Sequence, residues 1–226
     1  VLLYGVGTSG DWTYSVLDNQ ATITGYSGAG GAVDIPAVVN EISVVKVGDD
    51  YPPIFGNGNT TVTSVTIPDS VTSIGDYAFR SCTSLASVTI PDSVTSIGDY
   101  AFYGCTSLTS ITVDADNSNY SSVDGRLFNK LQTSLVQHPA GILDNSYTIP
   151  DSVTSIGGYA FVYGTNLTSI TIPDSVTSIG EYAFNGCSNL TSITIPDSVT
   201  NIEDGAFFGC SSLTSINIPV GVTSIE

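Results

Sequence analysis

The sequence predicts a β-rich solenoid, a right-handed superhelix of stacked coils with short parallel strands and single helical turns. One phrase, Ile-Pro-Asp-Ser-Val-Thr, returns at a spacing of 23 residues over much of the chain. Each repeat also ends in a strict alternation of apolar and polar residues, which is the period of a β-strand. Because the apolar residues of one repeat cannot enclose a core alone, successive repeats must stack on one another.

The repeats set the expected domain organisation. The phrase begins at Ile67, Ile90, Ile149, Ile172 and Ile195. Residues 35–226 therefore contain seven repeats and the start of an eighth, which we expect to form one solenoid domain. The repeat that starts at Val113 is longer than the others, and its long insertion falls at 114–148.

The repeat from Ile172 illustrates the expected elements. Ile193-Thr194-Ile195 alternates as a strand, and Pro196 ends it because proline cannot donate to a ladder. The segment 176–179 predicts a second short extended piece on the opposite wall. Residues 181–185, followed by Gly186, predict one helical turn closed by a left-handed residue.

Residues 1–34 are expected to form a capping hairpin and a glycine-rich joint. Residues 12–16 and 21–24 alternate in polarity, and Asp18-Asn19 between them suits a turn. A solenoid needs its open first coil covered, so this hairpin is interpreted as the cap. The glycine-rich stretch 25–31 joins it to the repeats.

The composition excludes several classes of function. The 226 residues hold 4 Lys and Arg against 21 Asp and Glu, a formal net charge of −17. Nucleic-acid phosphates need clustered cations, so nucleic-acid binding is not expected. No stretch approaches the roughly 18 apolar residues of a membrane span, so none is expected. A protein partner should present a basic surface to this acidic chain.

The repeat resembles that of the BspA-like class of leucine-rich repeats. The matching residues run from Leu85 through Ala101-Phe102 to Cys105 and Leu108, and they recur from Leu167 to Leu190. The resemblance implies a curved, strand-lined solenoid on a bacterial or protozoan surface protein, secreted or attached to the cell, with a role in adhesion. It implies no catalytic centre. Gly164 stands where other repeats carry Cys, and Gly205 where Tyr recurs.

The four cysteines share one place of the repeat, in two pairs spaced by 23 residues. Adjacent coils would bring Cys82 near Cys105, and Cys187 near Cys210, within reach of a disulfide. The alternative is a ladder of buried free thiols that act as small apolar side chains. We favour free thiols because the place is clearly in the core.

Acidic residues form two further columns. One column comprises Asp69, Asp92, Asp151, Asp174 and Asp197, and the other includes Asp76, Asp99, Glu181 and Asp204. Stacked carboxylates could attract calcium. The favoured interpretation is that Asp after Pro shapes a turn and stays solvated. We therefore expect no metal and no other cofactor, with calcium kept as an alternative.

The most regular outward feature is a grid of hydroxyl side chains on the main strands. Its candidate partner-binding residues are Ser87, Thr89, Ser110, Thr112, Ser169, Thr171, Ser192 and Thr194. Such a grid could meet a glycan or order water or ice. Small polar and β-branched residues are also simply good exposed strand residues.

Two expected loops complete the candidate contact residues. The long insertion carries Arg126, Lys130 and His138, and we expect it to project as a hairpin with His138 on the surface. The segment 49–53 is expected to project as a second loop carrying Tyr51. Loops on a rigid scaffold commonly carry function.

The sequence thus predicts a non-catalytic, extracellular or cell-surface binding and adhesion module that recognises a protein or matrix partner. The chain has a single His, with no Ser and Asp at a recognised catalytic spacing, so no enzyme is expected. The alternatives are a glycan- or ice-ordering surface, and a structural spacer within a larger surface protein.

Overall fold

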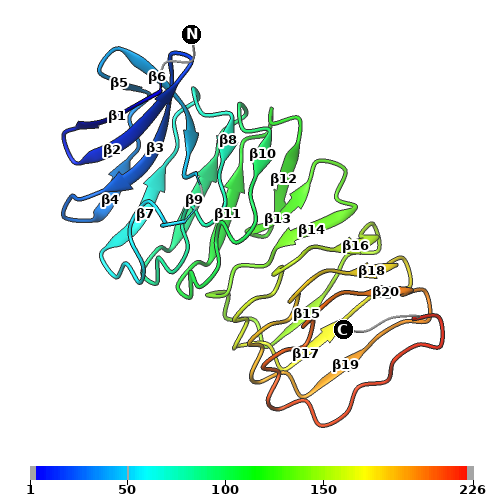
Figure 1. The fold of residues 1–226 in the computed structure, drawn as a ribbon. Helices are drawn as coiled ribbons and strands as arrows, with labels where there is room; N and C mark the ends of the chain where they lie inside the picture. The colour runs from blue at the N-terminus through cyan, green and yellow to red at the C-terminus, as the bar shows by residue number, and fades with distance from the viewer. Residues whose placement is uncertain (1–3, 50, 223–226) are drawn as a thin grey trace. The chain divides into compact units, whose positions relative to one another are not determined.

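The computed structural model describes residues 4–49 and 51–222. It divides into two compact units, an N-terminal half (Val1–Asn119) and a C-terminal half (Tyr120–Glu226), which are described separately. Each half is a β-solenoid, and the described residues contain no helix (Figure 1). The β-rich solenoid predicted from the repeat is confirmed.

The N-terminal half contains two sheets. The larger has 7 strands in the order β1-β2-β3-β6-β8-β10, with β5 paired to β6. Its strands are β1 (Tyr4–Ser9), β2 (Trp12–Leu17), β3 (Gln20–Tyr26), β5 (Val38–Val39), β6 (Ile42–Val47), β8 (Ser73–Ile74) and β10 (Ser96–Ile97). The smaller sheet has the order β11-β9-β7-β4. Its strands are β4 (Gly31–Asp34), β7 (Val62–Thr66), β9 (Ser87–Ile90) and β11 (Ser110–Val113).

The C-terminal half repeats this two-walled plan. One sheet has the order β12-β13-β14-β16-β18-β20, and the other has the order β15-β17-β19. The first comprises β12 (Tyr120–Val123), β13 (Arg126–Asn129), β14 (Ser134–Gln137), β16 (Ser155–Ile156), β18 (Ser178–Ile179) and β20 (Asn201–Ile202). The second comprises β15 (Ser146–Thr148), β17 (Ser169–Thr171) and β19 (Ser192–Thr194).

The repeat length fixes the register of the ladders. In the smaller N-terminal sheet, Val65 pairs with Val88 and Val88 with Ile111, each in parallel. Every such partner lies one repeat along the chain, so identical places of the repeat stack on each other. The second wall follows the same rule, because Ser178 pairs with Ser155 and Asn201. The extended piece predicted at 176–179 is therefore present, as the two-residue strand β18.

The apolar column of phenylalanines forms the centre of each half. The rings of Phe79 and Phe102 stack at 5.6 Å, and those of Phe161 and Phe184 at 5.0 Å. All four side chains are buried. Stacked rings bury large areas and add attraction beyond that burial, so this column is a main source of stability.

The single helical turns are not confirmed, because the structure places turns at these residues. Tyr77 and Ser81 have positive φ angles of 56° and 58°, outside the right-handed helical region. Alternate N–H groups, those of Tyr77, Phe79 and Ser81, donate to the carbonyls of Asp99, Ala101 and Tyr103 in the next coil. A helix would direct them four residues back along its own chain. Pairing between neighbouring coils therefore uses N–H groups that a helical turn would need for its own hydrogen bonds.

The N-terminal hairpin is present. Strands β2 and β3 pair antiparallel, and Asp18 and Asn19 turn between them with positive φ. Strand β3 then pairs in parallel with β6, so the hairpin continues the larger sheet. Trp12 packs against Tyr26 at 4.6 Å between ring centroids. The expected role of this hairpin as a cap stays a prediction.

The long insertion does not project as a hairpin, which corrects the expectation from its sequence. Strands β12, β13 and β14 form an antiparallel meander, and β14 pairs in parallel with β16 of the next coil. Leu127 and Phe128 of β13 and Leu135 of β14 are fully buried, because these apolar side chains gain free energy by joining the core. The insertion also contains the division between the two halves at 119/120. One solenoid domain over 35–226 stays a prediction.

The four cysteines are free and buried. Sγ of Cys105, Cys187 and Cys210 donates to the carbonyls of Phe79, Phe161 and Phe184, at 3.0, 3.1 and 3.2 Å. Burial raises the pKa of Cys82 and of Cys187 to about 12. This agrees with the favoured interpretation of small apolar side chains.

Candidate binding surfaces

The predicted hydroxyl grid exists on both main sheets. Ser87 pairs with Ser110 and Thr89 with Thr112, while Ser169 pairs with Ser192 and Thr171 with Thr194. These eight side chains are exposed or half-exposed, and their inward neighbours Val88, Ile111, Ile170 and Ile193 are buried. The grid is therefore an accessible polar face. Its role in binding stays a prediction.

Two of the predicted contact residues are buried. Arg126 is 5% exposed and His138 is 1% exposed, so neither can meet a partner in this structure. The expected surface position of His138 is wrong. It follows β14, whose parallel pairing with β16 draws this part of the insertion into the core.

The buried pair belongs to a small aromatic and ionic cluster. The Arg126 guanidinium lies 4.2 Å from the centre of the Tyr147 ring and forms an ion pair of 2.5 Å with Asp144. The His138 ring contacts both Tyr147 and Phe161 at 5.1 Å, and neither ring nitrogen has a hydrogen-bond partner among the described residues. Burial, and then the Arg126 charge, lowers the pKa of His138 to about 4. The imidazole is thus neutral at pH 7 and serves as a core ring.

The other two predicted contact residues are exposed. Lys130 lies at the turn between β13 and β14, beside Leu131, which is 79% exposed. Tyr51 is 56% exposed, whereas Ile54 and Phe55, which directly follow the loop, are buried. Tyr51 in the loop at 49–53 is therefore accessible to a partner, while the residues that follow the loop anchor it to the core. Asp50 lies outside the described residues.

Tyr51 belongs to a cluster of four tyrosines around one arginine. The Arg80 guanidinium lies 5.3 to 5.8 Å from the ring centres of Tyr51, Tyr77 and Tyr103. The rings of Tyr77 and Tyr100 stack at 4.6 Å, and Tyr100 meets Tyr103 edge-on at 6.1 Å. We call these five residues the tyrosine–arginine cluster. Mutual packing holds its side chains in place at the surface of the N-terminal half.

Of this cluster, the sequence analysis named only Tyr51, and Arg80 is the most informative member that it missed. Its place in the repeat is taken by Tyr103, Val162, Asn185 and Phe208 in other coils, so it breaks the pattern. The sequence signal that could have identified Arg80 is a cationic residue at a repeat position where the other repeats carry none. The described residues give it no carboxylate partner within ion-pair distance, in contrast to Lys46 and Arg126.

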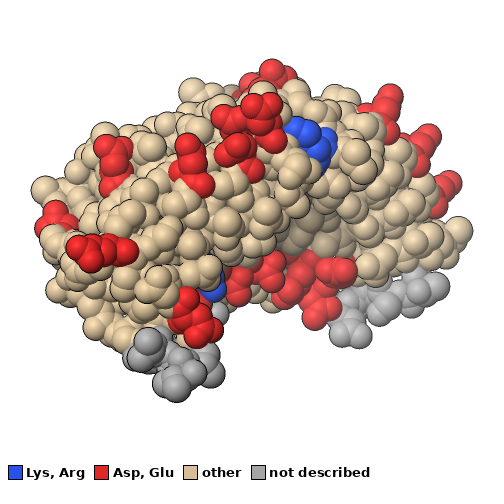
Figure 2. All heavy atoms as spheres, turned by 90° about the horizontal axis from the view of Figure 1, so that it is seen from above, with Lys and Arg blue, Asp and Glu red and all other residues tan. Residues whose placement is uncertain are grey.

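The acidic columns lie at the surface. Asp69, Asp92, Asp151, Asp174 and Asp197 are all exposed, as the turn interpretation requires. Figure 2 shows red carboxylates spread over the face drawn, with few blue cations among them. In the described part of the chain, no group of three or more His, Cys, Asp or Glu residues could hold a metal ion. The geometry therefore offers no calcium site built from such a group.

Family comparison settles the class of the repeat. The sequence model described as BspA type Leucine rich repeat region matches residues 54–138 and 143–226, in 6 copies. The chain belongs to the BspA-type leucine-rich repeat family. The resemblance seen in the repeat is confirmed. A search of the curated proteins finds no match.

Three solved structures illustrate what this one resembles. The pneumococcal vaccine antigen PcpA is 20% identical with a TM-score of 0.66, covering 100% of this chain and 78% of that one, which shows the fold alone. A leucine rich cell surface protein from Faecalibacterium prausnitzii is 28% identical with a TM-score of 0.53, covering 98% and 84%. A leucine-rich repeat protein of T. pallidum is 28% identical with a TM-score of 0.55, covering 95% and 88%.

These findings support a repeat module of the kind carried by surface proteins. Among the described residues, no helix has the length and apolar character needed to cross a membrane. The sole histidine of this BspA-type chain packs against the rings of Tyr147 and Phe161, and neither of its ring nitrogens has a hydrogen-bond partner among the described residues. A nucleophile needs a base within about 3 Å, and His138 does not supply one.

Proposed function

We propose that this chain is a non-catalytic binding module displayed outside the cell, and that it recognises a protein or matrix partner through the tyrosine–arginine cluster. Tyrosine and arginine are the residues that most often dominate the binding energy of protein interfaces. The cluster is pre-organised by its own stacking, so little side-chain entropy is lost when a partner binds. Two observations carry the proposal: the exposed ring of Tyr51, and the Arg80 guanidinium, which has no carboxylate within ion-pair distance among the described residues.

The charge of the chain constrains the partner. The formal net charge of −17 favours a basic surface around the point of contact, while Arg80 meets a carboxylate or carbonyl oxygen at its centre. Attraction between an acidic and a basic surface is screened by salt. The association rate should therefore fall as the ionic strength rises.

The repetition of the chain supports a role without catalysis. A catalytic centre needs one group set apart from the others, and the acidic, hydroxyl and thiol columns recur in coil after coil. The lone histidine is buried and neutral. The family and the structures compared are repeat proteins, which agrees with a binding scaffold.

Surface plasmon resonance against immobilised extracellular-matrix proteins and mucins tests the proposal. The double variant R80A/Y103A should weaken binding about 30-fold or more, since interface anchors commonly contribute at least about 2 kcal/mol. The matched control is Y159A, because Tyr159 stacks on Tyr182 at 5.3 Å in the C-terminal half and lies outside the tyrosine–arginine cluster. Equal losses in both variants, or unchanged binding by R80A/Y103A, would show that the cluster is not the interface.

A further inference from the structure

An outward row of polar side chains crosses four strands of the N-terminal half. Thr22 of β3 pairs with Lys46 of β6, Lys46 with Ser73 of β8, and Ser73 with Ser96 of β10. The alternate residues on these strands, such as Ile23, Val47 and Ile74, are buried in the core. The row therefore lies on the solvent side of the second wall, on the side of the coils opposite the hydroxyl grid.

Two open hollows lie along this row and share Lys46 and Ser73. One, of about 210 Å³, is lined by Lys46, Asp49, Ser73, Asp76 and Ser96 together with small residues. The other, of about 260 Å³, is lined by Leu17, Asp18, Gln20, Thr22, Lys46 and Ser73, with Val45 and Thr72. Each is smaller than the ~300–1,000 Å³ typical of ligand sites, and together they fall within the lower part of that range. We call the two hollows the Lys46 groove.

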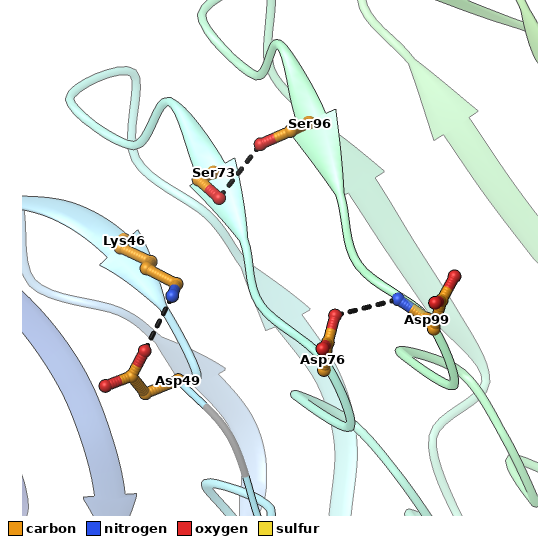
Figure 3. A network of polar contacts seen from close by, with 6 residues as sticks. All are labelled: Lys46, Asp49, Ser73, Asp76, Ser96 and Asp99. Carbon is orange, nitrogen blue, oxygen red and sulfur yellow. Dashed lines mark hydrogen bonds and ion pairs between the residues drawn. The ribbon is translucent and has the colours of Figure 1, made fainter.

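The polar groups of the groove are held by one another (Figure 3). Lys46 Nζ donates to Asp49 Oδ1 at 2.6 Å, Ser96 Oγ donates to Ser73 Oγ at 2.9 Å, and the N–H of Asp99 donates to Asp76 Oδ1 at 2.9 Å. Each still has capacity for a ligand, because an ammonium carries three N–H groups and a carboxylate two oxygens. The groove thus offers fixed donors and fixed acceptors side by side.

A glycine keeps part of the groove open. A Cβ on Gly98 would lie 2.2 Å from Asp76 Oδ1 and 2.6 Å from Asp76 N, so any larger residue would displace that carboxylate. The absence of a side chain at Gly98 leaves Asp76 directed along the wall, next to the paired hydroxyls of Ser73 and Ser96. The acceptor at this end of the groove therefore depends on close backbone packing.

The charges of the groove exclude an anionic ligand. Lys46 is paired with Asp49, and with Asp18 and Asp76 the lining carries a net negative charge that repels an anion. In the described part of the chain, no group of three or more His, Cys, Asp or Glu residues could hold a metal ion, so the hydroxyls and backbone-held polar groups are the features left for a ligand. A sugar ring offers hydroxyls that both donate and accept, and a C–H face that can pack on Leu17, which is 49% exposed. We propose that the Lys46 groove binds a neutral oligosaccharide.

The corresponding row of strand residues in the C-terminal half shows which side chains the repeat places on this wall when no ligand site is proposed. There Ser134, Ser155, Ser178 and Asn201 pair in register, with no lysine among them. Lys46 therefore departs from the small polar residues that stacking places on this wall. The departure lies where the two hollows meet, which is the place a ligand would contact most.

A glycan array followed by calorimetry on the full chain tests the proposal. The wild type should bind a neutral oligosaccharide, and S73V should weaken that binding about tenfold or more, since it removes a shared hydroxyl and fills both hollows. S178V is the matched control, because Ser178 has the same place and the same kind of strand in the C-terminal half. Far-ultraviolet circular dichroism checks that both variants keep the fold. A second variant, K46Q, should also weaken binding.

Three results would overturn the proposal. These are the absence of any bound neutral glycan, an equal loss of binding in S178V, and a preference for sulfated or carboxylated glycans that weakens between about 0.05 and 0.5 M sodium chloride. The variant R80A/Y103A separates this site from the protein interface proposed above. It should leave glycan binding unchanged even if binding to the protein partner is lost.

Discussion

The most unusual single residue is His138, a titratable ring enclosed by Tyr147 and Phe161. Its sequence context, the only histidine in an inserted segment, favours a surface role. The structure buries it, because β14 pairs in parallel with β16 and the chain that follows enters the core. Only long-range pairing decides this, and the sequence around position 138 carries no signal for it.

Burial of His138 predicts a pH-dependent loss of stability. Its pKa is about 4 when folded, against an ordinary value of 6.5, so the unfolded chain takes up the proton first as the pH falls. The contribution is therefore complete above about pH 6.5 and is lost on acidification toward pH 4, by about 2–3 kcal/mol at pH 4.5. Urea unfolding should show that the wild type loses about this much more stability than H138F between pH 7.5 and 4.5. Parallel pH profiles would contradict the assignment.

The cysteines give a second prediction at this scale. Because burial raises the pKa of Cys82 and Cys187 to about 12, no reactive thiolate forms at pH 8 in the folded chain. Ellman's reagent should detect almost no thiol in the native protein and all 4 after denaturation without reductant. Recovery of only two thiols, or none, would show that disulfides had formed.

At the scale of one element, the turn between the two walls is set by backbone shape. Tyr77, Tyr100, Tyr159 and Tyr182 all have positive φ, and Gly205 takes the same place with φ of 59°. A second left-handed place follows four residues later, at Ser81, Gly104, Tyr163, Gly186 and Gly209. The sequence analysis anticipated the left-handed Gly186 but not the other place. Tyrosine is rarely left-handed, so its type alone could not reveal this conformation.

The left-handed places predict unequal effects of two similar substitutions. G186A and G209A both place an L-residue at positive φ, which costs about 1–2 kcal/mol. The new Cβ of G186A would also lie 2.6 Å from the Tyr163 ring, whereas that of G209A would come no closer than 3.3 Å to its neighbours. G186A should therefore lower the free energy of unfolding more than G209A in urea titrations. The reverse order would mean that the Tyr163 ring moves aside freely.

At the scale of the whole molecule, the net charge of −17 is distributed over stacked coils. Neighbouring strands lie about 4.8 Å apart, so carboxylates at one place of the repeat repel each other along each half. The exposed column that includes Asp151, Asp174 and Asp197 is an example. This repulsion is present in the folded state and is weaker in the expanded chain.

Screening should therefore stabilise the chain. Raising sodium chloride from about 0.01 to 0.3 M shortens the Debye length from about 30 Å to below 8 Å and should raise the melting temperature. Differential scanning calorimetry measures the shift. Potassium chloride should act equally, since general screening does not distinguish the cations. A melting temperature that falls with salt would show that attractive pairs, such as Lys46–Asp49, outweigh the repulsion.

The sequence by itself determined the solenoid, the register of its ladders, the buried columns and the exposed hydroxyl grid. A repeat of fixed length puts equal residues on neighbouring coils, and the burial of apolar residues such as Val88 and Phe184 then leaves few alternatives. Only the tertiary structure decided where the residues that break the repeat pattern lie. Arg126 and His138 are buried in the core, the Arg80 guanidinium lies beside three tyrosine rings, and Lys46 lies between two hollows. These outcomes depend on contacts between segments far apart in the chain, where no repeat dictates which residues meet.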